Sequence, residues 1–252
     1  MAVPNDDVLD LFGRITDRAA EVVAGTTDWG PSGRRPGQYL VDLDVDEVCV
    51  GPLLAAGFGV LSEESGLQFP PADAGHAGVV VVDPVDGSTN ASLGLPWCAT
   101  SLCLVVDGVP EVSMVTNLVT GQRWTAVRGS GAAMDGRPIA VERRVSLDDS
   151  VVAVSGLPAR HYGWRQFRAM GASALDICSV ASGAFDAFVD MSDSAHGVWD
   201  YVGAVLVVTE AGGVVADATG LDLVVLDPAE RRTPVAATSP ELLEALLVER
   251  RR

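Results

Sequence analysis

The sequence predicts an α/β protein, of the α+β kind with layered helices and sheets, and two observations support this prediction. From about residue 98 to 141, apolar runs alternate with Asp-Gly and Thr-Gly turns, which is typical of a meander of antiparallel strands. From about residue 150 onward, strand patterns alternate with helical patterns, which is typical of an α/β layer. We therefore expect an N-terminal half, 1–145, and a C-terminal half, 146–252, joined in one compact unit.

The N-terminal half begins with a predicted helix over residues 5–24, where apolar side chains recur at helical spacing. Residues 25–38, "GTTDWGPSGRRPGQ", are rich in Gly and Pro and predict a loop. We expect a second helix after Asp44, interrupted at Gly51-Pro52 because proline breaks a helix interior. The run "FGVLSEES", residues 58–65, predicts a short strand that ends in acids.

The C-terminal half predicts three strands that alternate with three helices. Short apolar runs flanked by Gly or Ser mark the strands, and longer apolar-periodic runs mark the helices. The predicted strands are 150–156, 184–190 and 212–217, and the predicted helices are 172–183, 200–211 and 239–250.

The charge of the chain limits its partners. Seventeen Lys and Arg face 34 Asp and Glu among 252 residues, which gives a net charge of −17. Nucleic acid and anionic membranes bind basic surfaces, so we expect neither as a partner. An anionic small substrate would also be repelled unless bound cations reverse the local field.

The cysteines and the apolar segments indicate a compartment. Cys49, Cys98, Cys103 and Cys178 form no C-x-x-C pair, and most have apolar neighbours, so we expect buried free thiols in a reducing compartment. The N-terminus lacks a basic region followed by an apolar run, and no apolar stretch reaches membrane-spanning length. We expect a soluble cytoplasmic protein.

An acidic turn follows the most apolar run of the chain. The four valines 79–82 predict a strand buried on both faces, and Asp83 and Asp86 follow around Pro84 and before Gly87. Such a turn holds two carboxylates and a backbone carbonyl in a small volume, which is costly unless a cation lies between them. Magnesium prefers these hard oxygen ligands. The alternative is an ordinary surface turn, where Asp, Pro and Gly are common.

Two further stretches place acids beside apolar runs. Glu63 and Glu64 follow a short apolar run, and Asp200 stands at the start of an apolar helix. Alone, Asp200 is better explained as a helix-cap or first-turn aspartate stabilised by the helix dipole. Together with the acidic turn, these stretches favour a divalent-cation site.

The stretches "SEES" (62–65), "DPVDGST" (83–89) and "WDYVGAVLVVTEAGG" (199–213), in this order, resemble the inositol monophosphatase family of magnesium-dependent, lithium-sensitive phosphatases. Residues 128–139 and 168–188 also resemble segments of that family, and the similarity covers roughly residues 40–225. The resemblance implies alternating αβαβα layers, a metal site between the two halves and a homodimer.

The resemblance also implies ligands for two or three Mg²⁺ ions. Glu64, Asp83 and the carbonyl of Val85 would hold one ion. Asp83, Asp86 and Asp200 would hold a second, and Glu64 would share in a third, weaker one.

Further roles follow from the same resemblance. Asp44 would act with the Ser88 hydroxyl on the attacking water, so that Asp44, Glu64 and Ser88 are the expected catalytic residues. Asp190 stands near the family's substrate-contacting glutamate, in an altered loop where His196 is expected to be solvated. The expected substrate-binding residues are Gly87, Ser88, Thr89, Gly171, Ala172, Ser173 and Asp190.

This site would suit the hydrolysis of a phosphate monoester. The substrate is a dianion and water is a poor nucleophile, and metal ions neutralise the first and lower the pKa of the second. The leading hypothesis is therefore hydrolysis of inositol monophosphate to inositol and phosphate by direct attack of a metal-activated water. Fructose 1,6-bisphosphate and histidinol phosphate are alternative substrates within the family. A non-catalytic homologue that binds a metal or a ligand is the alternative of another class.

Overall fold

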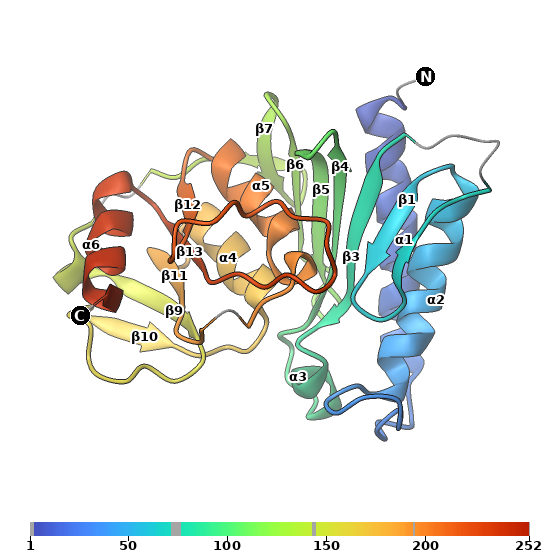
Figure 1. Cartoon of the computed structure of the whole chain (residues 1–252), viewed down its shortest axis with the longest axis horizontal. Helices are drawn as coiled ribbons and strands as arrows, with labels where there is room; N and C mark the ends of the chain where they lie inside the picture. Colours follow the sequence, from blue (N-terminus) through green and yellow to red (C-terminus); the bar gives the residue numbers. More distant parts are fainter. Residues whose placement is uncertain (1–2, 72–76, 143–144, 194, 252) are drawn as a thin grey trace.

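The computed structural model describes residues 3–71, 77–142, 145–193 and 195–251, and these form five alternating layers of helices and sheets. Two helices cover one face of a large sheet, two more lie between this sheet and a smaller one, and a last helix covers the outer face of the smaller sheet (Figure 1). The expected αβαβα arrangement is confirmed.

The outer helices on the large sheet are α1 (Asn5–Gly25) and α2 (Leu40–Ala55). The first matches the predicted helix and buries one apolar stripe against the sheet, as helical spacing requires. The prediction that α2 follows Asp44 is wrong, because the helix already begins at Leu40 and continues through Pro52.

The large sheet has eight strands in the order β2-β1-β3-β4-β5-β6-β7-β8. Its only parallel pair among the described strands is β1 with β3, and β4 to β8 form the predicted antiparallel meander. The strands are β1 (Gly59–Ser62), β2 (Gly66–Gln68), β3 (Val79–Asp86), β4 (Ala99–Val106), β5 (Val109–Asn117), β6 (Arg123–Val127), β7 (Gly131–Met134) and β8 (Arg137–Ile139).

Strand β3 is buried along its whole length and runs further than the four valines predict. It continues to Asp86, with a register shift against β4 between Asp83 and Asp86. Such an irregularity re-aims side chains at the end of a ladder, so the two acids leave the regular pleat here. The short helix α3 (Ser88–Ser92) follows directly.

The middle layer contains α4 (Ser173–Ala181) and α5 (Val202–Glu210), packed between the two sheets. Both lie inside the ranges predicted for helices, and all of α4 is buried. A single 3-10 turn, η2 (Val198–Asp200), leads into α5 and contacts β3. This contact brings Asp200 to the acidic end of the large sheet.

The smaller sheet has the strand order β10-β9-β11-β13-β12 and is covered by α6 (Pro240–Arg251). Three of its strands and α6 were predicted, whereas the short β10 and β13 and the 3-10 turn η1 (Leu147–Asp149) were not. The strands are β9 (Val151–Ser155), β10 (Gln166–Arg168), β11 (Ala187–Asp190), β12 (Val214–Asp217) and β13 (Pro234–Ala237).

All four cysteines are buried free thiols, as predicted. Among the described residues, no helix is both long enough and apolar enough to cross a membrane.

Candidate active site

Three carboxylates meet where the large sheet faces the middle layer. Glu63, Asp83 and Asp200 each place one carboxylate oxygen within 4.8 Å of those of the other two. They come from the turn after β1, from β3 and from η2, so residues far apart in sequence build one acidic cluster.

The parallel pairing of β1 with β3 positions Glu63 in this cluster. Ser62 is paired with Val82, and the amide of Glu63 donates to the carbonyl oxygen of Val82 at 3.1 Å. Glu63 therefore lies beside Asp83 at the same level of the two strands. The family resemblance implied Glu64 as a metal ligand. The glutamate that lies with Asp83 and Asp200 in the structure is Glu63, and the role of Glu64 stays a prediction.

Asp83 is a buried member of the cluster whose carboxylate is not hydrogen-bonded to the described residues. It is 1% exposed, and neither of its carboxylate oxygens has a hydrogen-bond partner among the described residues. Burial, followed by the charges of Glu63, Asp86 and Asp200, raises its pKa well above the ordinary value. An ionised carboxylate is stable in such a place only with a cation beside it, and oxygen donors of this kind suit Mg²⁺. The residues present therefore fit a divalent metal ion.

The pKa values of its two neighbours, Glu63 and Asp200, are also raised. Burial and the adjacent charges of Asp200 and Glu64 raise the pKa of Glu63 to about 8. Burial also raises the pKa of Asp200, although His196 and the amide of Gly197 act in the opposite direction. A cation bound here would lower all of these pKa values at once.

Asp86 lies three residues further along β3 but is held differently. Its Oδ1 accepts a hydrogen bond from the amide of Ser173 at 3.1 Å, and its Oδ2 accepts one from the amide of Ala174 at 2.7 Å. These amides begin α4, so the carboxylate is stabilised by the N-terminus of that helix. Burial still raises the pKa of Asp86. Its role as a metal ligand stays a prediction.

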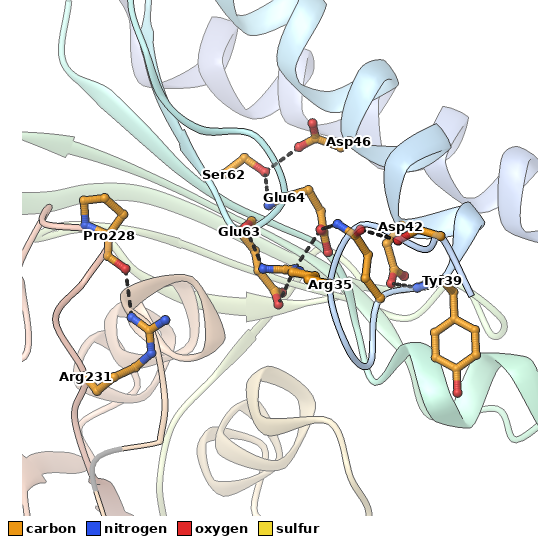
Figure 2. A network of polar contacts seen from close by, with 11 residues as sticks. Arg35, Tyr39, Asp42, Asp46, Ser62, Glu63, Glu64, Pro228 and Arg231 are labelled. Atoms are coloured by element: carbon orange, nitrogen blue, oxygen red, sulfur yellow. Dashed lines mark hydrogen bonds and ion pairs between the residues drawn. The ribbon is translucent and has the colours of Figure 1, made fainter. Parts of the chain in front are cut away.

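Glu64 contacts the loop before α2 (Figure 2). Its Oε2 accepts hydrogen bonds from Arg35 Nη2 at 2.7 Å and from the side-chain amide of Gln38. The same Arg35 nitrogen lies 2.9 Å from Glu63 Oε1. One guanidinium therefore bridges the two adjacent glutamates.

A cavity of about 310 Å³ opens next to this bridge. Its walls come from the loop before α2, the first turns of α2 and α3, the two adjacent glutamates and the end of β3. The lining residues are Arg35, Pro36, Gly37, Gln38, Asp42, Glu63, Glu64, Val85 and Ser88. Val85, whose backbone carbonyl is an expected metal ligand, and the expected catalytic residue Ser88 therefore both line this cavity.

Asp42, and not Asp44, faces this cavity. Asp42 Oδ2 accepts a hydrogen bond from the amide of Tyr39 at 2.8 Å, while its buried Oδ1 has no partner in the described part of the chain. Burial raises the pKa of Asp42 to about 7. Asp44 is exposed and lines a different surface hollow beside α1, because residues two apart on a helix face different directions.

Gly87 joins the acidic turn to the segment before α4. Its φ of 82° is left-handed, and a Cβ at this position would lie 2.9 Å from the carbonyl oxygen of Trp97 and 3.0 Å from the Cβ of Ala172. Only glycine fits both the conformation and the space. The structure therefore brings Gly87 together with Gly171 and Ala172, as the predicted substrate site requires, whereas Thr89 is exposed.

Asp190 and His196 form a buried network beside Ser173. Asp190 is 0% exposed and accepts hydrogen bonds from the amide and hydroxyl of Ser192, and its Oδ2 lies 2.8 Å from His196 Nδ1. His196 Nε2 in turn lies 2.8 Å from Ser173 Oγ. The expectation that His196 is solvated is wrong, since it is 8% exposed. The carboxylate of Asp190 is thus hydrogen-bonded to Ser192 and His196, and a contact between Asp190 and the substrate stays a prediction.

Sequence reasoning named Glu63 among the acids without a ligand role, and it missed Asp42, Arg35 and the burial of His196. Two signals could have revealed the places of Glu63 and Asp42. Continuing the β1 pairing by one residue beyond Ser62 places Glu63 beside Asp83. A helix start at Leu40 would have turned Asp42 toward the turn at Ser88.

Comparison with known proteins gives one family. The profile described as "Inositol monophosphatase family" matches residues 41–252. A protein of Methanothermobacter thermautotrophicus named "Fructose-1,6-bisphosphatase/inositol-1-monophosphatase" is 30% identical over 92% of this chain and 88% of its own length. A protein of Xylella fastidiosa named "Nus factor SuhB" is 32% identical over 73% of this chain and 70% of its own length.

Solved structures agree with these relatives. The crystal structure of the extragenic suppressor protein suhB from Bartonella henselae superposes with a TM-score of 0.82 and 25% identity, over 98% of this chain and 99% of that one. Four further curated relatives are matched over 63–66% of their own length.

Proposed function

The chain belongs to the inositol monophosphatase family, and we propose that it is a magnesium-dependent phosphatase of small phosphorylated alcohols. The observation that supports this most strongly is Asp83, a buried carboxylate with no hydrogen-bond partner in the described residues, beside Glu63 and Asp200. Buried polar groups in folded proteins are normally hydrogen-bonded, so an unsatisfied carboxylate beside two others favours a functional cation site.

The metal ions would be held by Glu63, Asp83 and Asp200, with the carbonyl of Val85 and Asp86 as further ligands. Bound Mg²⁺ supplies charge neutralisation of the phosphate and a lowered pKa of the attacking water. Two or three ions, as the family resemblance implies, would offset the carboxylates around the cavity. Glu64, expected as a ligand, is bound to Arg35 and would join only after that contact opens.

We assign to Asp42 the role of proton acceptor that the family resemblance implied for Asp44. Its Oδ1 has no partner among the described residues, its pKa is about 7 and it shares the cavity wall with Ser88. A base is most effective when its pKa lies near the working pH. Asp42 Oδ1 would accept the proton of the attacking water, which the Ser88 hydroxyl orients by hydrogen bonding.

Inositol monophosphate is the first candidate substrate. The name of the Methanothermobacter relative combines fructose-1,6-bisphosphatase and inositol-1-monophosphatase, so fructose 1,6-bisphosphate is the second, and histidinol phosphate is the third. The alcohol part would lie near Gly87, Thr89 and the segment Gly171–Ser173. Asp190 would act on it indirectly, by holding His196 against Ser173.

Phosphate release measured with and without Mg²⁺ tests this function. The protein and its Asp83→Asn variant would be supplied with inositol, sugar, histidinol and nucleotide phosphates in parallel. We expect Mg²⁺-dependent release from at least one of the first three and almost none from the variant. Release that is independent of Mg²⁺, or equal in the variant, would contradict the proposal.

A non-catalytic homologue is the second candidate. It is favoured by the Xylella relative, whose name is that of a Nus factor and not of a phosphatase. The cluster of Glu63, Asp83 and Asp200, together with Asp42 in the wall of the adjacent cavity, argues against it. Metal binding without turnover on any phosphate in the panel would favour this candidate over the first.

The remaining expectations from the resemblance are proposals of the same kind. We propose a homodimer, to be measured by light scattering, and inhibition by Li⁺ in competition with Mg²⁺. We also propose that the halves 1–145 and 146–252 share the active site. The four free thiols support a reducing, cytoplasmic compartment.

A further inference from the structure

Arg35 is the cation closest to the acidic cluster. Its Nη2 contacts Glu63 Oε1 at 2.9 Å and Glu64 Oε2 at 2.7 Å, and its Nη1 donates to the backbone carbonyl of Glu63 at 3.2 Å. Figure 2 shows the guanidinium lying between the two glutamates. The side chain is 41% exposed, whereas that of Glu64 is 4% exposed, so the arginine reaches inward from a surface loop.

The contact with Glu63 competes with a metal ion. Glu63 belongs both to the Arg35 bridge and to the cluster with Asp83 and Asp200. A divalent ion held by Glu63 would neutralise the negative charge that attracts the guanidinium. The positive charge of the ion would also repel the guanidinium. Metal binding and the Arg35–Glu63 contact therefore oppose each other.

Once released from the glutamates, Arg35 would be placed to bind the phosphate group of a substrate in the same cavity. The cavity wall that contains Arg35 also contains Ser88 and Val85, which border the predicted phosphate position. A guanidinium offers two parallel N–H donors that match two phosphate oxygens, and it keeps its charge at every physiological pH. The adjacent Arg34 is exposed and has no ion pair with the described carboxylates, so it is not held in the same way.

We propose that Arg35 is a substrate-binding residue that bound Mg²⁺ releases from Glu63 and Glu64 and that then binds the phosphate group of the substrate. This inference rests on the proposed metal site. It implies positive coupling, because each ligand removes a contact that hinders the other, and such coupling is equal in both directions.

The test measures binding and not turnover. Calorimetry would give the affinity of the metal-free protein for Mg²⁺ alone, and then its affinity for inorganic phosphate at saturating Mg²⁺. The variants are Arg35→Gln, which removes the charge, Arg35→Lys, which keeps the charge but not the paired donors, and Arg34→Gln as the matched control.

In Arg35→Gln we expect Mg²⁺ to bind as tightly as in the wild type or up to about tenfold more tightly, while phosphate binds about tenfold more weakly or worse. Arg35→Lys should leave Mg²⁺ affinity near the wild-type value and weaken phosphate binding by a smaller factor. Arg34→Gln should change neither affinity.

Two results would overturn the inference while leaving the metal site intact. One is weaker Mg²⁺ binding with unchanged phosphate affinity in Arg35→Gln, which would mean that Arg35 only orients Glu63. The other is equal loss of phosphate affinity in the Arg34 and Arg35 variants, which would mean a general effect of loop charge. Failure of the wild type to bind Mg²⁺ would overturn the proposed metal site and this inference with it.

Discussion

Strands β3 and β12 each carry an aspartate directly after an apolar run, Asp83 in β3 and Asp217 in β12, and the two carboxylates have opposite surroundings. Asp217, which ends β12, accepts hydrogen bonds from the amides of Thr219 at 2.8 Å and Thr233 at 2.7 Å, and from the Thr219 hydroxyl. Burial alone would raise its pKa, but these hydrogen bonds lower it. Asp83 has no such donor in the described part of the chain, and its pKa is raised.

The difference comes from the backbone that follows each aspartate. The segment after β12 folds back so that its amides point at Asp217, whereas the residue after Asp83, still within β3, is Pro84, which has no N–H. Asp217 is thus a structural acid that stabilises a turn. Asp83 is held in place without a partner, and a cation is the natural complement of its charge.

The largest effect is expected from Asp83→Asn. We expect nearly all Mg²⁺-dependent phosphate release to disappear, together with the thermal stabilisation by Mg²⁺. The metal-free variant should melt at a higher temperature than the metal-free wild type, because a buried charge has been removed. Release assays and melting curves with EDTA or Mg²⁺ measure both; retained turnover would break the comparison.

Asp42→Asn should reduce kcat by about 10²-fold, at the lower end of the range for a positioned general base. Wild-type kcat/KM at saturating Mg²⁺ should rise with pH as Asp42 ionises, with a midpoint below the metal-free pKa of about 7 because bound Mg²⁺ favours the ionised carboxylate, and the variant should lose this rise. Asp44→Asn is the control on the same helix and should change neither quantity. A loss in the Asp44 variant alone would restore the assignment made from the sequence.

Asp217→Asn should show the reverse of the Asp83 result. Loss of hydrogen bonds to a charged group costs on the order of 1.5–3 kcal/mol of unfolding free energy, while kcat should stay within about twofold of the wild type. Urea unfolding measures the first quantity and phosphate release the second. A large loss of kcat at full folding would show that Asp217 is more than a structural acid.

The two regions should also respond to pH with opposite signs. Glu63 has an ordinary pKa of 4.5 when unfolded and about 8 in the metal-free fold, so the folded state holds the extra proton between these values. The stability of the metal-free protein should therefore fall as the pH rises from about 4.5 to about 8. Asp217, whose pKa is lowered, contributes stability that is present above its ordinary pKa of 3.8 and is lost as the pH falls below it.

Melting temperatures from about pH 3 to about pH 8.5, in EDTA and in Mg²⁺, measure this response. Saturating Mg²⁺ should flatten the slope, because it favours the ionised carboxylates. Glu63→Gln should flatten it partly in EDTA, since Asp83 and Asp200 remain. If the slope of melting temperature against pH in EDTA were identical in wild type and Glu63→Gln, the raised pKa of Glu63 would be contradicted.

Much of the layered fold could be predicted from the sequence, because each half has its own apolar period. The meander and the helix over residues 5–24 follow directly from hydrophobic spacing. The start of α2 could not be predicted, because its N-cap residue is Tyr39 and not one of the usual capping residues Ser, Thr, Asp or Asn. That single error turns the expected Asp44 out of the cavity and Asp42 into it.

The acidic turn was identified, but its partners depended on tertiary contacts. Glu63 and Glu64 are chemically identical neighbours, and only the pairing of β1 with β3 decides which one lies beside Asp83. In the same way, nothing local in the sequence indicates that the carboxylate of Asp190 is occupied by His196 and Ser192. Register and long-range hydrogen bonds are the information that a single sequence lacks.

The hydrogen bonds of Asp86 to Ser173 and Ala174 span 87 and 88 residues of chain. Contacts of such long range form late in folding, because a large loop must close before they reward the chain. During synthesis, the strand with Asp83 and Asp86 leaves the ribosome well before α4 and Asp200 exist. The newly made N-terminal half therefore lacks Asp200, and the acidic cluster is assembled only when the second half docks.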